Sequence, residues 1–198
     1  MGRLSLVSRQ RTSPYEALCH TLPPVSEPSA PPPEDRDWTY VITQGCTECG
    51  FTPFHHTLAA ARLRETVPLW RAALAEASAT ARPAPLVWSP LEYGCHVRDV
   101  CRVMGRRVEL MLAVDGTSFA NWDQDGTAIT DRYWAQDPGK VADEYATAAE
   151  LAAATLDTVS GDAWERRGIR SNGSQFTVAT LAVYFLHDVE HHLHDVGA

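Results

Sequence analysis

Apolar residues recur at the spacing of α-helices along four long segments between about residue 55 and the C-terminus. The first segment covers about His55–Ala79, and Pro68 inside it predicts a kink or a division into two helices. The second begins at Ser89, the third spans about Pro138–Val159, and the last runs from Thr177 to the end. The stripe expected to face the core in the first segment consists of Leu58, Ala61, Leu63, Trp70 and Leu74.

The clearest helix start in the chain is the stretch SPLEYGCHVRDV. Ser89 suits the N-cap, Pro90 suits the first helical position, and Glu92 completes a capping box with Ser89. Thr177 is expected to cap the last helix with its hydroxyl group. Four helices of three or more turns, with little strand signal, predict an all-α fold and, within that class, a four-helix bundle.

The first 36 residues differ from the rest, because TLPPVSEPSAPPPEDRD carries six prolines and almost nothing apolar. Such a segment cannot offset its ordering entropy, so we expect residues 1–36 to be disordered or extended; a docked tail with one short helix at SPYEALCHTL is the alternative. Residues 37–54 are expected to form an arm, in which WTYVI is a strand or extended and QGCTECGF is a tight turn bounded by glycines. Residues 55–198 then form the bundle domain.

Composition and charge restrict the function classes. The chain has 198 residues, of which 44% are hydrophobic, enough for one domain with its own core. It shows no apolar run of about 18 residues and no signal peptide, so we expect a cytoplasmic protein without a membrane partner. A net charge of −8 disfavours nucleic-acid binding, and a small-molecule substrate is the expected partner. The oligomeric state is open, with a homodimer as one alternative.

The last helix carries the stretch HDVEHHLHDV, which holds four of the eight histidines. His187 and His191 are four residues apart, so they share one helix face with Cβ atoms about 5–6 Å apart and can both reach one metal ion. His96, the histidine of the second helix, is the expected third ligand. Three imidazoles would leave coordination positions open, as in catalytic metal sites. The alternative is that histidines gather here because they suit the negative end of the helix dipole.

Polar residues near these histidines are candidates for supporting roles. Asp99 follows His96 by three residues, and Asp188 and Glu190 lie between His187 and His191, so each could accept an imidazole N–H. Tyr184, one turn before His187, could donate to a bound substrate, with core packing as the alternative. We therefore predict Asp99, Glu190 and Tyr184 as catalytic candidates beside the metal.

Two further sets of charged residues have both a chemical and a structural interpretation. Glu92 could reach the metal, but its role in the capping box is favoured. Asp123 and Asp125 in WDQDG either face a cavity beside the metal or form a turn, and the turn is favoured. Arg98 and Arg102 lie on one face of the second helix. They form a solvated face or, if one turns inward, bind a carboxylated thiol cofactor or an acidic substrate.

Five cysteines without an export signal indicate reduced thiols or metal ligands more than a disulfide framework. Cys46 and Cys49 form a CxxC pair, and His55 and His56 stand close enough in sequence to complete a structural zinc site with them. A redox pair and unliganded thiols are the alternatives. The two cysteines of the second helix, Cys95 and Cys101, are expected in the core.

Three stretches together resemble the DinB-like superfamily, which includes the YfiT-type metal proteins and the mycothiol-dependent maleylpyruvate isomerases. They are WSPLEYGCHVRDV, the WDQD loop and FTVATLAVYFLHDVEHHLHDV, and the resemblance covers about residues 55–198. It implies a four-helix bundle that holds a divalent metal through one histidine of the second helix and an HxxxH pair of the fourth. In this sequence those ligands are His96, His187 and His191. The N-terminal tail and CTECGF depart from the simplest family pattern, which puts access to the site in doubt.

The resemblance also implies a class of reaction, because several characterised relatives are S-transferases or isomerases that use thiols such as mycothiol, bacillithiol or glutathione. We therefore expect a divalent-metal-dependent enzyme in which zinc, or alternatively nickel or iron, activates the thiolate of a mycothiol-type cosubstrate. The alternatives are a hydrolase in which the metal activates water, and a non-catalytic module that binds a metal or a small molecule.

Overall fold

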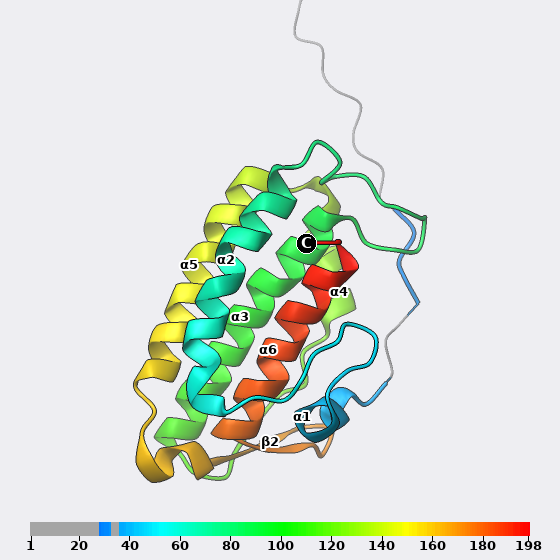
Figure 1. Ribbon diagram of the computed structural model, residues 1–198. Helices are drawn as coiled ribbons and strands as arrows, with labels where there is room; N and C mark the ends of the chain where they lie inside the picture. Colours follow the sequence, from blue (N-terminus) through cyan, green and yellow to red (C-terminus); the bar gives the residue numbers. More distant parts are fainter. Residues whose placement is uncertain (1–27, 33–35) are drawn as a thin grey trace, which may run out of the picture.

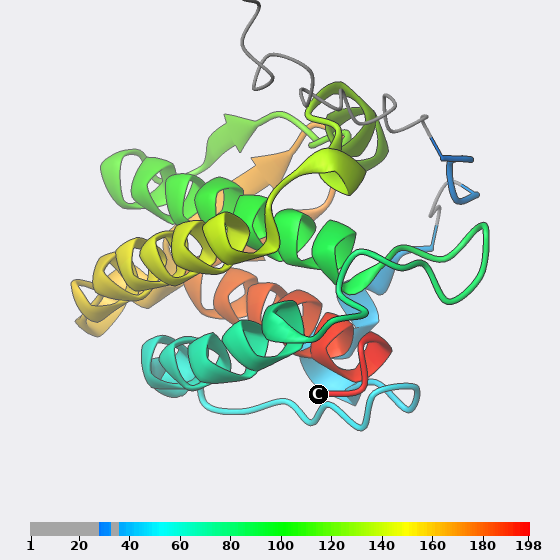
Figure 2. The ribbon, with the colours of Figure 1, turned by 90° about the horizontal axis from the view of Figure 1, so that it is seen from above.

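Four long helices form the body of the computed structural model, which describes residues 28–32 and 36–198. They are α2 (Ala59–Ala75), α3 (Pro90–Ala113), α5 (Pro138–Asp157) and α6 (Val178–Asp195). Both α2 and α3 pack chiefly against α5 and α6, so these two consecutive helices lie on opposite sides of the bundle (Figures 1 and 2). The predicted all-α four-helix bundle is confirmed.

Small side chains allow α3 and α5 to approach each other closely. A Cβ atom added at Gly105 of α3 would lie 3.4 Å from the Cβ of Ala152 of α5, which is already a tight contact. The stripe of α5 that faces the core is built mostly from alanines, namely Ala148, Ala149, Ala152 and Ala153. Larger residues such as Trp70 and Tyr145 fill the space between α2 and α5, with their ring centroids 5.9 Å apart.

The first long helix differs from its sequence-based description in two respects. Pro68 lies inside α2 and does not end it; the helix continues to Ala75, with Pro68 on its exposed side. Leu63, Trp70 and Leu74 are buried as expected, whereas Leu58 is 53% exposed and Ala61 is also exposed. Leu58 lies in a 3-10 turn before α2, where the spacing of an α-helix no longer applies.

Both predicted helix starts are present. The Ser89 hydroxyl accepts a hydrogen bond from the backbone N–H of Glu92, and the Glu92 carboxylate accepts one from the backbone N–H of Ser89 at 2.9 Å. The same carboxylate is buried and paired with Arg82. Glu92 is therefore the capping group of α3, and its oxygens are committed to these partners. At the start of α6, Thr177 and Thr180 form an equivalent box.

Replacing the cap residue Ser89 by alanine should lower the free energy of unfolding by about 0.5–2 kcal/mol, because the Glu92 N–H loses its acceptor. Urea denaturation measures this difference. Ser78→Ala is the matched control, since Ser78 is exposed and its change should stay within about 0.5 kcal/mol. Equal stability of the two variants would contradict the capping role.

A small sheet, which the sequence patterns did not predict, closes one end of the bundle. Its strands are β1 (Thr117–Phe119), β2 (Arg167–Arg170) and β3 (Gln175–Thr177), with β1 parallel and β3 antiparallel to the central β2. Gly168 is required in β2, because an added Cβ would lie 2.5 Å from the Phe119 ring. The short helix α4 (Gln124–Thr130) follows β1. Among the described residues, none of the helices is long and apolar enough to cross a membrane.

The arm, residues 37–54, packs beside α6 (Figure 1). Its WTYVI stretch is helical, with a 3-10 turn at Trp38–Tyr40 and the short helix α1 (Val41–Gln44), so the strand and the extended alternatives are both wrong. The tight turn after it is present, bounded by Gly45 and Gly50 at positive φ. Of the predicted tail, residues 1–27 and 33–35 lie outside the described residues.

Candidate metal centres

Helix α6 presents two i,i+4 pairs of side chains of the types that can bind a metal, offset by one residue. His187 and His191 form one pair, and Asp188 and His192 form the other. One residue corresponds to about 100° of rotation on a helix, so the two pairs face different neighbours. The first pair faces the arm and the second faces α3.

The histidine–aspartate group consists of His96, Asp188 and His192, whose ligand atoms all lie within 4.8 Å of one another. Oδ1 of Asp188 lies 3.1 Å from Nε2 of His96 and 3.4 Å from Nε2 of His192. His96 is 1% exposed, because the indoles of Trp88 and Trp122 cover its ring, the latter in a stacked arrangement at 5.4 Å. Two nitrogens and one oxygen are thus gathered at one point.

Asp195 orients this group from the end of α6. Its Oδ2 lies 2.7 Å from Nδ1 of His192, which leaves Nε2 of that ring directed toward Asp188. A carboxylate behind a histidine ligand fixes its tautomer and raises its basicity. Burial opposes ionisation of Asp188, but the neighbouring imidazoles of His96 and His192 outweigh it and hold the pKa of Asp188 below its usual value.

The cysteine–histidine group consists of Cys46 and Cys49 of the arm with His187 and His191 of α6. Burial lowers the pKa of His187 to about 4 and also lowers that of His191, so both rings are neutral at pH 7. Burial raises the pKa of the Cys49 thiol to about 11, which does not favour a reactive redox cysteine.

The two histidines that the sequence predicts as zinc ligands beside Cys46 and Cys49 lie elsewhere in the structure. His55 and His56 stack on each other at 4.4 Å, and His56 packs on Trp164. Neither belongs to the groups of potential ligands among the described residues. The prediction that these two histidines complete a site with the CxxC pair is therefore wrong. His187 and His191, which are distant in sequence, lie beside the pair in the fold.

The predicted triad of His96, His187 and His191 is divided between the two groups. His187 and His191 lie together, with ring centroids 5.1 Å apart, as the i,i+4 spacing predicts. His96 instead belongs with Asp188 and His192, the pair one residue further along α6. The sequence pattern predicts that histidines of α6 face inward, but it does not determine which of the two pairs faces α3.

Asp99, Arg98 and Arg102 form an ion-pair cluster away from both groups. Asp99 accepts two hydrogen bonds from Arg98, one from Arg102 and one from the hydroxyl of Tyr133 at 2.6 Å. Arg98 is 4% exposed and also binds Glu144. Burial raises the pKa of Asp99, but Arg98 and Tyr133 outweigh this effect and hold it below the ordinary value. These residues stabilise the bundle, and they do not line the cavity described below.

Glu190 also faces away from the metal-binding groups. Its carboxylate accepts two hydrogen bonds from the guanidinium of Arg62 on α2, at 3.0 and 2.6 Å. Both groups are partly buried between α2 and α6. Glu190 thus joins two helices, whereas the neighbouring Asp188 supplies the carboxylate at the histidines.

A cavity of about 670 Å³ opens over the two groups and reaches Asp188, His192, His187 and His191. Tyr184 lines it, as a substrate-contacting residue should, although its ring also packs on Phe176 at 5.4 Å. Residues of the cavity wall that the sequence analysis did not identify include Trp38, Trp88, Tyr93, Trp122 and Arg170. Scattered aromatic residues carry no periodic signal, so only the fold shows that they converge.

The WDQD loop contributes to the cavity as well as to the fold. Asp123 and Asp125 both line the cavity. Asp123 is at the same time the N-cap of α4, since its carboxylate accepts from the N–H of Gly126 at 2.9 Å. Asp123 therefore has both of the roles that the sequence left open for this loop, in the turn and at the cavity.

The residues of both groups fit a divalent metal. The cysteine–histidine group contains a buried imidazole nitrogen without a hydrogen-bond partner among the described residues, Nε2 of His187. Nδ1 of His96 is also buried and unpaired, but the nitrogen of that ring beside Asp188 is Nε2. A buried polar atom left unpaired costs about 1–3 kcal/mol. Imidazole, thiolate and carboxylate are the ligands that zinc and its neighbours in the first transition row accept. A four-helix bundle that gathers histidine and carboxylate side chains at a cavity has the arrangement in which bundle proteins build metal sites.

The model of the DinB superfamily matches residues 57–196, and the chain belongs to this family. A similar solved structure is that of YfiT from Bacillus subtilis, described as a probable metal-dependent hydrolase with an unusual four-helix bundle topology. It shares 14% identity and a TM-score of 0.63 over 71% of this chain and 85% of that one, a likeness of fold. None of the curated proteins compared with this chain matches it.

Proposed function

We propose that this protein is a metal-dependent hydrolase of a small molecule, with His96, Asp188 and His192 as the metal ligands. The observation that carries the proposal is that three protein donors converge, with no fourth among the described residues, and that two of them, Asp188 and His192, line a cavity. Catalytic zinc sites typically have three protein ligands, and two histidines with one carboxylate is a set that zinc hydrolases use. A divalent ion bound there supplies Lewis acidity toward a substrate oxygen or water.

The surrounding side chains would bind and orient the substrate. Trp38, Trp88 and Trp122 offer apolar surface and exclude water from the ligand group. Arg170 lies in the cavity wall, within 6 Å of the Tyr184 ring, where its guanidinium could bind a carboxylate. This combination favours a substrate that has a planar or apolar part and an anionic group.

A second candidate, thiol transfer with a low-molecular-weight thiol that carries a carboxylate, such as bacillithiol or glutathione, is favoured by the same Arg170. Arg98 and Arg102, the cationic residues expected to bind such a cofactor, are engaged with Asp99. Arg170 lines the cavity instead, and its guanidinium would donate to the carboxylate of such a thiol. In this function the substrate would be consumed only when the thiol is added.

An activity screen on zinc-reloaded protein tests the proposal. Small esters, amides and lactones with an anionic group would be supplied first without and then with a low-molecular-weight thiol. Hydrolysis that disappears after chelation and returns with zinc supports the hydrolase. Turnover that requires the thiol supports the transferase, and the absence of turnover in both series contradicts an enzymatic role.

Changing Asp195 to asparagine should weaken metal binding or activity by about 10–100-fold, because His192 loses the carboxylate that fixes its ring. The measurements are zinc affinity by competition with a chelator and the rate on the best substrate of the screen. Asp157→Asn, at an exposed carboxylate of α5, is the matched control and should leave both unchanged. An unaltered Asp195→Asn protein would show that this carboxylate does not support the site.

A further inference from the structure

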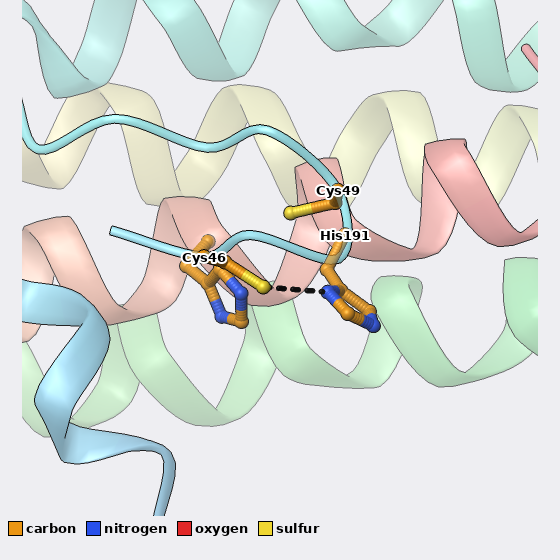
Figure 3. Close-up of side chains that lie close together, drawn as sticks. Cys46, Cys49 and His191 are labelled. Carbon is orange, nitrogen blue, oxygen red and sulfur yellow. Dashed lines mark hydrogen bonds between the residues drawn. The ribbon is translucent and has the colours of Figure 1, made fainter. Parts of the chain in front are cut away.

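We propose that Cys46, Cys49, His187 and His191 form a second metal site, a closed structural zinc centre that fastens the arm to α6. One ligand atom of each residue lies within 4.8 Å of those of the other three. Figure 3 shows the sulfur of Cys46 directed at the ring of His191, with Cys49 on the same loop. This inference does not rest on the proposed hydrolase, because none of the four residues belongs to the histidine–aspartate group.

The dimensions of the group match tetrahedral zinc. Sγ of Cys46 lies 3.7 Å from Nδ1 of His191. Bonds of about 2.3 Å to sulfur and about 2.0–2.1 Å to nitrogen place two such ligands about 3.5–3.6 Å apart at a tetrahedral angle. Two sulfurs and two nitrogens also form a ligand set that selects zinc among the common divalent metals.

The loop is built to hold both sulfurs toward the helix. The N–H of Cys46 donates to the carbonyl of Phe51 at 2.9 Å, which closes the turn around the CxxC pair. Gly45 adopts φ +75°, and a Cβ there would lie 2.5 Å from the Phe51 oxygen, so no other residue fits without a shift. A two-residue spacing between cysteines is the usual one in zinc sites.

Aromatic rings close the site from outside. Trp38 packs on both His187 and His191, at 5.3 and 5.1 Å, and Phe51 packs on His187 at 5.2 Å. Four protein donors fill a tetrahedral shell, so this centre has no position left for substrate. Its role is structural: it would hold Trp38, a residue of the cavity wall, in place over the cavity.

Neither a disulfide nor a simple hydrogen bond accounts for the group as well. The two thiols are free, and a disulfide between them would not account for the imidazoles of His187 and His191 that lie beside them. A thiol is a weak donor, and its bond to His191 would leave Nε2 of His187 buried and unpaired. A metal ion would engage all four residues at once.

Cobalt(II) substitution of the full chain, purified without a histidine tag, tests the site. Native mass spectrometry should find two metal equivalents, and the near-ultraviolet spectrum should contain a thiolate-to-cobalt charge-transfer band. Cys46→Ser with Cys49→Ser should lose one equivalent and the whole band. His96→Ala should lose the other equivalent and keep the band. His55→Ala, at an exposed histidine that directly follows the arm, is the control and should keep both.

A readout on the unaltered protein covers the case in which the cysteine variant does not fold. With zinc bound, Cys46 and Cys49 should resist a thiol reagent, and removal of zinc by a chelator should make two further thiols reactive. The inference would be overturned if wild-type protein bound a single metal equivalent, showed no charge-transfer band, and lost that equivalent in His96→Ala. A single equivalent that disappears with the cysteines would instead uphold this site and remove the proposed hydrolase centre.

Discussion

His96→Ala should remove one metal equivalent and lower the activity found in the screen by more than about 100-fold. His96 is the one ligand that α3 contributes to the histidine–aspartate group, and it is buried against Trp88 and Trp122. Loss of a ligand should cost more than loss of a supporting carboxylate, for which about 10–100-fold is typical. Metal content by elemental analysis and the rate with saturating zinc are the two measurements.

The matched control for this variant is His194→Ala, because His194 is an exposed histidine on the same helix as the ligands. It should keep both the metal and the activity. Circular dichroism would establish that His96→Ala is folded before its activity is interpreted. A folded His96→Ala protein with full activity would contradict the proposed function.

Asp99→Ala should lower the free energy of unfolding by about 3 kcal/mol, because it leaves Arg98 buried with only part of its counter-charge. The folded fraction should keep its activity, since Asp99 faces Arg98, Arg102 and Tyr133. Urea denaturation and kcat measure the two effects separately. Glu109→Ala, which breaks an exposed pair on the same helix, should cost at most about 1 kcal/mol.

The same residue predicts a pH dependence of stability. The pKa of Asp99 is lower in the folded protein than in the unfolded chain, where it is about 3.9. The contribution of Asp99 to the free energy of unfolding is therefore complete above about pH 4 to 5, and it is lost as the pH falls through the pKa of the folded state. The stability difference between the wild type and Asp99→Ala should narrow below about pH 4. A constant difference down to pH 2 would contradict the ion-pair assignment.

The bundle could be predicted because its signals are local. The capping box at Ser89 and Glu92 and the threonine cap at Thr177 specify helix starts within a few residues. The sheet could not be predicted in the same way, because β1 and β3 have three residues each and are stabilised by pairing with β2. Such short strands contain too few positions for an alternating pattern to appear.

The candidate site could be predicted only to within one residue on α6. A helical wheel identifies residues that share a face, and both 187/191 and 188/192 satisfy its rule. Which pair meets His96 depends on the rotation of α6 relative to α3, a tertiary quantity. The same limit applies to Cys46 and Cys49, whose partners come from a helix about 140 residues further along the chain. No spacing rule in the sequence connects them.

Whether α6 serves two separate metal centres can be seen by anomalous diffraction at the zinc edge from crystals of the zinc-loaded full chain. We expect two peaks, one bound by His96, Asp188 and His192 and the other bound by Cys46, Cys49, His187 and His191. A single peak bound by His96, His187 and His191 would contradict this expectation.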